Sequence, residues 1–278
     1  MADPVACVIG WPVAHSRSPV IHRFWLNQLG LAGDYVLQPV EPARISDFLA
    51  GFANSGFVGA NVTVPHKQAA FVAAARRDGA AEATGAVNTI WLEDGRVSAA
   101  NTDPVGFLAN LDEQTPGWDG RPGAAVVLGA GGAASAVAWA LLGRGFAPVH
   151  LVNRTTARAE ALAERFGKHV RAAAWSALPR LMREARIVVN ATSLGMDGQP
   201  TLDADVAALP GDAVVADLVY VPLETPLLAA ARARGARTAD GLGMLLHQAV
   251  PGFERWFGER PQVTPALRAA VLASIGSA

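Results

Sequence analysis

Short apolar runs alternate with longer stretches of mixed polarity along this chain, which predicts strands followed by helices. In its N-terminal part, the apolar runs predict strands at Ala6–Ile9, Tyr35–Pro39, Gly59–Val64 and Val87–Leu92. The stretches beside them predict helices at Pro19–Leu29, Ile45–Ala53, Gln68–Ala75 and Pro104–Leu111.

A second alternating block follows residues 115–123, which are rich in glycine and proline and are expected to form a linker. Its predicted strands are Ala125–Leu128, Val149–Val152, Ile187–Asn190 and Ala213–Leu218, with helices at Ala133–Leu142 and Ala157–Phe166. After Gly241 the pattern becomes helical, at Met244–Trp256 and Pro265–Leu272. This arrangement predicts two α/β domains with largely parallel sheets and a helical tail.

Composition excludes several classes of protein. The 278 residues are 51% hydrophobic and carry a formal net charge of -1, which argues against a disordered chain and against a general nucleic-acid binder. The single cysteine, Cys7, can form neither an internal disulfide nor a zinc site alone, so no metal is expected. Residues 122–143 lack charge, but a strand and a glycine turn interrupt them, so no membrane span is expected. Because the first residues lack a basic signal region, the default expectation is a cytoplasmic protein.

The glycine turn that follows the strand Ala125–Leu128 fits the pattern G-x-G-x-x-A. In such a turn, the first glycine permits the tight bend and the second lets the backbone approach a pyrophosphate at the helix N-terminus. The strand and helix around it favour a dinucleotide site. Its candidate residues are Gly129, Ala130, Gly131, Gly132 and Ala133.

The end of the next strand favours NADP over NAD. An NAD site is expected to place an acid here, but the chain has Asn153, Arg154 and Thr155, with Arg158 one turn further on. Arginine guanidinium groups suit a 2′-phosphate, so these residues are candidates for its binding. The alternative is that Arg154 and Arg158 form a solvated helix face.

Polar patches occur at four places in the N-terminal half: 15–19, 61–67, 85–89 and 101–103. Each alone could be turn or helix-cap chemistry. Four patches in one candidate domain instead indicate a site for a hydroxyl-rich ligand.

These patches carry a resemblance. His-Ser-x-Ser-Pro, Asn-Val-Thr-x-Pro-His-Lys, Gly-Ala-Val-Asn-Thr and Asn-Thr-Asp, in this order, resemble the shikimate dehydrogenase family. The glycine turn, Asn-Arg-Thr, Asn-Ala-Thr-Ser-Leu-Gly-Met and Gly-Leu-Gly-Met-Leu-Leu-His-Gln-Ala continue the match, from His15 to Ala249. Two positions depart from the family pattern: Arg23 stands where asparagine is frequent, and Ala100 where glycine is common.

The resemblance implies an α/β protein of two domains, with the C-terminal helices returning to the first. Residues 1–103 and 241–278 would form the substrate domain, and residues 104–240 a Rossmann-like NADP domain. The implied reaction is the reversible NADPH-dependent reduction of 3-dehydroshikimate to shikimate in aromatic amino-acid biosynthesis. The only partner expected is this small-molecule substrate, for a monomer or homodimer.

The family also implies roles for single residues. Lys67 and Asp103 would handle the proton, a task suited to lysine because arginine essentially cannot be deprotonated. Ser16 and Ser18 would hold the substrate carboxylate, with Tyr220 approaching it from the cofactor side. The residues expected to bind the ring hydroxyls are Asn61, Thr63, Asn88 and Gln248. Those expected against the nicotinamide are Thr192, Val219, Gly241 and Met244. His15 and His66 would only support loops.

Three alternatives stay open. A quinate/shikimate or amino-shikimate dehydrogenase of the same fold often has an acid after the second cofactor strand or an altered serine pair, which this chain lacks. A non-catalytic sensor of the same fold should lose the Lys–Asp pair, which this chain keeps. A methylene-tetrahydrofolate dehydrogenase fits the polar patches poorly.

Overall fold

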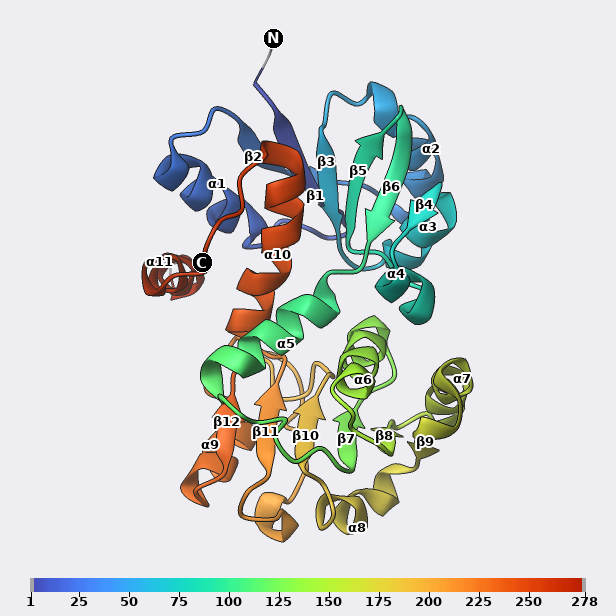
Figure 1. The fold of residues 1–278 in the computed structure, drawn as a ribbon, viewed down its shortest axis with the longest axis vertical. Coiled ribbons are helices and arrows are strands. Elements are labelled where there is room, and N and C mark those ends of the chain that lie inside the picture. The colour runs from blue at the N-terminus through green and yellow to red at the C-terminus, as the bar shows by residue number, and fades with distance from the viewer. Residues whose placement is uncertain (1–2, 277–278) are drawn as a thin grey trace. The chain divides into compact units, whose positions relative to one another are not determined.

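The computed structural model describes residues 3–276, and the chain divides into two compact units. The first unit comprises the residues up to Thr102 together with those from Leu246 onward, and the second runs from Asp103 to Leu245 (Figure 1). None of the helices within residues 3–276 is long and apolar enough to cross a membrane. The first unit is therefore discontinuous in sequence, and the second is continuous.

A mixed sheet forms the centre of the first unit, with strand order β2-β1-β3-β5-β6-β4. Its strands are β1 (Val5–Gly10), β2 (Asp34–Pro39), β3 (Gly59–Val62), β4 (Arg76–Arg77), β5 (Thr89–Glu93) and β6 (Arg96–Ala100). β1 pairs in parallel with β2 and β3, whereas β5 runs antiparallel to both β3 and β6. The hairpin turn between β5 and β6 holds Asp94 and Gly95 at φ values of 54° and 72°. Three of the five strand pairings in this sheet are parallel, as expected, and the two antiparallel pairings are those of β5 with β3 and with β6. The tight turn after β5 produces the second of them.

Helices from both ends of the chain pack in the first unit. They are α1 (Ser18–Leu29), α2 (Ile45–Ala50), α3 (Lys67–Ala73), α4 (Gly79–Thr84), the part of α10 (Leu242–Phe257) from residue 246, and α11 (Pro265–Gly276). Short 3-10 turns occur at Pro42–Arg44 and Phe52–Asn54. α11 packs against α1, so the expected return of the C-terminal helices to the first part of the chain is confirmed.

An aromatic cluster ties α10 to α1 and β2. The His22 ring stacks on Tyr35 with centroids 4.0 Å apart, and Trp25 and Phe253 pack edge to face at 5.4 Å. Trp256 donates from Nε1 to the Ile90 carbonyl at 3.0 Å. A Cβ at Gly59 would collide with this indole, so β3 needs glycine there to admit the helix.

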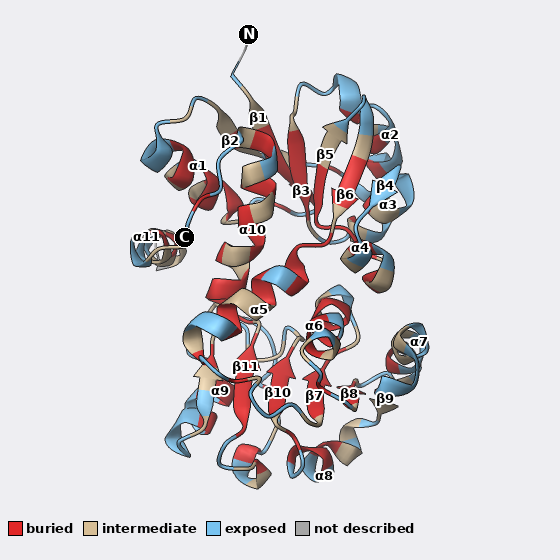
Figure 2. Cartoon of the chain, viewed as in Figure 1, coloured by how far each residue is buried: buried red, intermediate tan, exposed pale blue. Residues whose placement is uncertain are grey.

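The second unit contains a wholly parallel sheet, ordered β12-β11-β10-β7-β8-β9. Numbered along this unit alone, that is the 3-2-1-4-5-6 order of a Rossmann fold. Its strands are β7 (Ala125–Leu128), β8 (Val149–Val152), β9 (Val170–Ala173), β10 (Ile187–Asn190), β11 (Val214–Asp217) and β12 (Arg237–Ala239). Figure 2 shows the central strands buried, as parallel strands covered on both faces must be. The predicted α/β class and Rossmann-like domain are confirmed.

Helices α5 (Asp103–Gln114), α6 (Gly132–Gly143), α7 (Thr156–Phe166), α8 (Leu178–Met182) and α9 (Pro226–Ala233) complete the second unit, with 3-10 turns at Gly167–His169, Trp175–Ala177 and Val206–Ala208. The uncharged stretch at 122–143 is therefore β7, a turn and α6. Residues 115–123 do not link the two units but connect α5 to β7 inside the second. Trp118 anchors this loop, stacking on Phe146 at 5.2 Å and donating to Asp112 at 2.9 Å.

Candidate active site

Three of the predicted substrate-binding residues share one hydrogen-bond network in the first unit. Asn61 Nδ2 donates to the Asn88 carbonyl at 3.2 Å, and Asn88 Nδ2 donates to Gln248 Oε1 at 3.1 Å. Thr102 joins the network, since its backbone N–H donates to Asn88 Oδ1 at 2.8 Å and its hydroxyl donates to the Gln248 carbonyl at 2.8 Å. All four side chains are buried. Residues from β3, the start of β5, the end of β6 and α10 therefore meet in one polar cluster.

Two hydroxyl side chains lie together at the start of α1. Ser16 Oγ donates to Ser18 Oγ at 3.2 Å and accepts from the Ser18 N–H at 3.3 Å. Arg17, the N-cap residue, makes no side-chain cap. The hydrogen bonds of Ser16 to Ser18 therefore stabilise the turn before α1. Thr63 lies directly after β3, where its backbone N–H donates to the Ile9 carbonyl at 2.9 Å. Arg23, which departs from the family pattern, instead pairs with exposed Asp34 at 2.7 Å, on the surface of this unit.

Lys67 is the first residue of α3, at the end of the polar patch that follows β3. The preceding residue, His66, is buried and its Nε2 lies 2.7 Å from the Val40 carbonyl. The Lys67 carbonyl accepts from the Val87 N–H at 3.1 Å. The backbone that carries Lys67 is thus fixed from both sides. Asp103 is buried and is the first residue of α5, where the second unit begins.

The glycine turn lies where the order of the second sheet reverses, between β7 and its neighbours β8 and β10. Gly129 has φ +115°, and a Cβ on it would lie 3.0 Å from the Ala191 carbonyl oxygen and 3.3 Å from Thr192 Cγ2. A residue with a side chain is strained at such a φ. α6 begins at Gly132 without a side-chain cap, so its first N–H groups point towards the turn. This donor set fits a dinucleotide pyrophosphate.

The carboxyl end of β8 carries the residues expected to distinguish NADP from NAD. Asn153 donates from Nδ2 to the Thr155 carbonyl at 2.9 Å, which closes the turn into α7. Arg154, Thr155 and Arg158 are exposed there. Two exposed guanidinium groups beside the helix N-terminus fit a 2′-phosphate.

The ends of β10, β11 and β12 bring together the residues expected against the nicotinamide. Thr192 follows β10 and lies beside Gly129. A Cβ on Gly241 would lie 2.3 Å from the Leu218 carbonyl oxygen and 2.8 Å from that of Val219, so only glycine lets these segments meet. Met244 is buried in the core of the second unit, and Tyr220 is half-buried beyond Val219.

No individual role was predicted from the sequence for four buried residues with polar groups, Tyr35, Thr102, Asn190 and Asp217, although Thr102 lies in the patch 101–103 and Asn190 in a family motif. The signal for two of them was available, because the apolar runs of β10 and β11 each end in a polar residue. Burial raises the pKa of Asp217 to about 6, although its hydrogen bonds to Thr225, Val219 and Asn190 act in the opposite direction.

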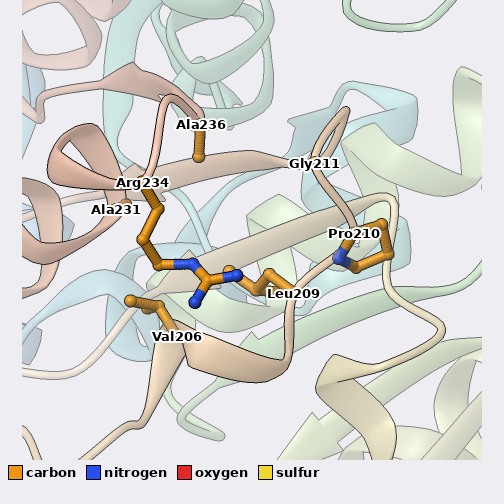
Figure 3. Close-up of a pocket in the computed structure, with 7 residues that line it drawn as sticks. All are labelled: Val206, Leu209, Pro210, Gly211, Ala231, Arg234 and Ala236. Carbon is orange, nitrogen blue, oxygen red and sulfur yellow. The ribbon is translucent and has the colours of Figure 1, made fainter.

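A small cavity lies at the amino ends of β11 and β12. Its volume is about 10 Å³, enough for one water molecule, and Figure 3 shows the residues that line it. Its lining is largely apolar: Val206, Leu209, Pro210, Gly211, Ala231, Arg234 and Ala236.

Comparison with known proteins agrees with this geometry. Residues 8–90 match the shikimate dehydrogenase substrate binding domain, residues 119–196 the shikimate / quinate 5-dehydrogenase family, and residues 241–272 the shikimate 5′-dehydrogenase C-terminal domain. The shikimate dehydrogenase (NADP(+)) of Azorhizobium caulinodans is 58% identical over 97% of this chain and 96% of its own. The chain belongs to the shikimate dehydrogenase family. The family predicted from the sequence motifs is therefore confirmed.

Solved structures of the shikimate dehydrogenase family match the whole chain. The enzyme of Thermus thermophilus, in complex with NADP(H) and shikimate, superposes with a TM-score of 0.87 at 38% identity and covers 98% of this chain and 99% of its own. The quinate dehydrogenase of Corynebacterium glutamicum, in complex with NAD, has a TM-score of 0.89 at 32% identity and covers 98% and 100%. Fold alone does not separate the two activities.

Proposed function

We propose that this chain is an NADP-dependent shikimate dehydrogenase, which reversibly reduces 3-dehydroshikimate to shikimate for aromatic amino-acid biosynthesis. The observation that carries the proposal is the buried amide network of Asn61, Asn88 and Gln248 in a chain of this family. Such a network gathers amide donors and acceptors in one place, which suits a substrate with several hydroxyl groups.

The first unit binds the substrate in this proposal. Ser16 and Ser18, with hydroxyl oxygens 3.2 Å apart, hold its carboxylate, and Tyr220 contributes from the second unit. Asn61, Thr63, Asn88 and Gln248 bind its ring hydroxyls. The network that joins the three amides keeps their donors and acceptors oriented before the substrate arrives, which lowers the entropy lost on binding.

Lys67 and Asp103 handle the proton. The Lys67 ammonium gives a proton to the ketone oxygen as that carbon is reduced, and the oxygen becomes the new hydroxyl. Asp103 orients the ammonium and hydrogen-bonds the same hydroxyl. The His66 contact with Val40 and the Val87 N–H bond to the Lys67 carbonyl hold the backbone from which the Lys67 side chain extends.

The second unit holds the cofactor. When bound, NADPH supplies the hydride. Gly129, Ala130, Gly131, Gly132 and Ala133 cradle its pyrophosphate, and Asn153, Arg154, Thr155 and Arg158 hold its 2′-phosphate. Thr192, Val219, Gly241 and Met244 contact its nicotinamide.

Some finer predictions rest on the sequence alone. A cytoplasmic location and a monomeric or homodimeric state stay predictions. A quinate/shikimate or amino-shikimate dehydrogenase is the second candidate function, and the similarity to a quinate dehydrogenase structure favours keeping it. Arg154 at the end of β8, where an NAD site is expected to have an acid, favours the first candidate.

A spectrophotometric assay at 340 nm with shikimate and quinate against NADP+ and NAD+ tests the proposal. The kcat/KM for shikimate with NADP+ is expected to exceed the other three values by about tenfold or more, a difference of ~1.4 kcal/mol. Equal values for quinate would favour the second candidate, and no turnover with any pair would contradict both.

A further inference from the structure

The two central strands β10 and β11 end in a pair of buried polar side chains. Asn190 and Asp217 lie opposite each other in the parallel register, and Asn190 Nδ2 donates to Asp217 Oδ1 at 2.8 Å. Both residues are 1% exposed or less. The pair therefore joins the carboxyl ends of two neighbouring strands without reaching solvent.

The Asp217 carboxylate accepts from two further donors. The Val219 N–H donates to Oδ1 at 3.0 Å, and the Thr225 hydroxyl donates to Oδ2 at 2.7 Å. Thr225 is itself the N-cap of α9, accepting from the Leu228 N–H at 3.3 Å. One carboxylate thus ties together β10, the loop after β11 and the start of α9.

The Asn190 amide organises the loop after β10 in the same way. Its Oδ1 accepts from the Thr192 N–H at 3.1 Å and from the Thr192 hydroxyl at 2.7 Å, and its Nδ2 also donates to the Leu194 carbonyl at 3.0 Å. The Thr192 hydroxyl in turn accepts from the Leu194 N–H at 3.1 Å. Thr192 is therefore held in position by bonds that all lead back to Asn190.

Burying a carboxylate to hold a loop has an unfavourable desolvation free energy. Its desolvation costs free energy that an apolar pair of similar volume would avoid. Buried charged groups of this kind are frequent at functional sites. Asp217 lies next to loops that line the candidate site, so a functional role is favoured.

We propose that Asn190 and Asp217 are positioning residues that hold Thr192 and Val219 ready for the nicotinamide half of the cofactor. This inference rests on the proposed function, which places Thr192 and Val219 at the nicotinamide. Asn190 and Asp217 are buried and act through the two loops. Because the loops are ordered in advance, less conformational entropy is lost when the cofactor binds.

Two variants of Asp217 test the role. Asp217→Asn keeps Oδ1 as an acceptor for Asn190 and Val219, and its amide can donate to the Thr225 hydroxyl, so the dissociation constant for NADP+ is expected to stay within about threefold of wild type. Asp217→Ala removes all three bonds and is expected to raise that constant by about 10- to 100-fold, as loss of an orienting partner does in other sites.

Binding of a cofactor fragment distinguishes a positioning role of Asp217 from a general loss of folding. Adenosine 2′,5′-bisphosphate carries the adenine half of the cofactor and contacts only the glycine-turn side and the β8 end in this proposal. Isothermal titration of the Asp217→Ala protein is expected to show fragment affinity within about twofold of wild type while NADP+ affinity falls.

Thr225→Val provides a milder test should Asp217→Ala fail to fold. It removes the hydroxyl that donates to Asp217 and caps α9 at the Leu228 N–H, with nearly the same side-chain shape, and about a three- to tenfold weaker NADP+ affinity is expected. Thr115→Val is the matched control, because Thr115 is another buried threonine of the second unit and its hydroxyl bonds only the Leu111 carbonyl, at 2.9 Å, among the contacts recorded in residues 3–276. Its NADP+ affinity is expected to match wild type.

The outcomes are distinct. Wild-type NADP+ affinity in Thr225→Val and in a folded Asp217→Ala protein would overturn the inference, as would equal weakening of NADP+ and the fragment. Failure of the wild-type protein to bind NADP+ would instead contradict the proposed function.

Discussion

The Tyr35 hydroxyl donates a hydrogen bond of 2.7 Å to Oδ1 of Asn61, and both side chains are buried. On its other side, the Asn61 amide donates to the Asn88 carbonyl, which can only accept. The orientation of the Asn61 amide is therefore fixed by β2 on one side and by the start of β5 on the other. A buried tyrosine of the edge strand β2 in this way supports a residue of the proposed substrate site.

Replacing Tyr35 by phenylalanine removes that single donor. We expect Tyr35→Phe to lower the free energy of unfolding by about 1–2 kcal/mol, because Asn61 Oδ1 loses a buried partner. The KM for shikimate is expected to rise by about three- to tenfold while the KM for NADP+ stays constant, a split that steady-state kinetics measures. Ser98→Ala removes another buried hydroxyl of the first unit, one that donates to Glu93 at 2.9 Å, and should change neither constant. An unchanged shikimate KM in Tyr35→Phe would refute the link.

Lys67 is predicted to act as the proton donor rather than as a charge. We expect both Lys67→Ala and Lys67→Arg to lose about 10²–10⁴-fold in kcat, because arginine keeps the charge but cannot release the proton. Binding of NADP+, measured by fluorescence titration, should be retained. Lys168→Ala is the control, since Lys168 is the other lysine of the chain and is exposed. Restored turnover in Lys67→Arg would indicate a purely electrostatic role.

Arg154 is predicted to select NADP. Arg154→Ser should lower kcat/KM for NADP+ by about 10- to 100-fold, because it loses a charge-assisted bond to the 2′-phosphate, and should leave the NAD+ value nearly constant. Arg171→Ser, an exposed arginine on β9, serves as the control and should change neither value. A parallel loss with both cofactors would point to a structural role for Arg154.

His22 should make the protein sensitive to acid. Burial lowers the pKa of His22 to about 3, although the nearby Asn61 side chain acts in the opposite direction, and neither ring nitrogen has a partner with hydrogen-bond geometry within residues 3–276. The aromatic rings around it are Trp25, Tyr35, Phe253 and Trp256. Because the unfolded chain binds a proton below pH ~6.5 and the folded chain does not, the contribution of His22 to stability is present above that pH and declines by up to ~1.4 kcal/mol per unit as pH falls towards 3.

Urea unfolding of His22→Phe at several pH values measures that contribution. Between pH ~6.5 and 4.5 the variant is expected to lose about 2–3 kcal/mol less stability than wild type, since phenylalanine cannot take up a proton. His15→Gln replaces an exposed histidine and should follow the wild-type curve. Identical pH dependence in His22→Phe and wild type would show that His22 does not carry the effect.

Local patterns predicted most of the strands and helices, because buried parallel strands such as β7 and β10 are written as continuous apolar runs. Strand β6 was not predicted, since Val97 is the one large apolar residue in Arg96–Ala100. The Asp94-Gly95 pair was nevertheless a readable hairpin signal. For this antiparallel pair of strands, the turn residues predict the hairpin better than the sequence of β6 does.

The residues of the candidate site could be predicted only in part from the sequence, and the reason is different. Lys67, Asn88 and the glycine turn lie in contiguous motifs that the sequence displays directly. The partners that hold them, such as Tyr35 for Asn61 or Asp217 for Asn190, come from separate strands. Those pairings depend on strand order and register, which no local pattern contains.

The discontinuous first unit has a consequence for how the chain is made. Its sheet and α1 emerge early from the ribosome, but Phe253 and Trp256 of the aromatic cluster lie beyond the whole second unit. At roughly 5–20 residues per second, about 10–45 s of synthesis separate Tyr35 from Phe253. The Rossmann unit can therefore fold during translation, while His22, Trp25 and Tyr35 still lack their contacts with α10. During this interval these exposed aromatic side chains are open to non-native contacts, and synthesis of α10 ends it.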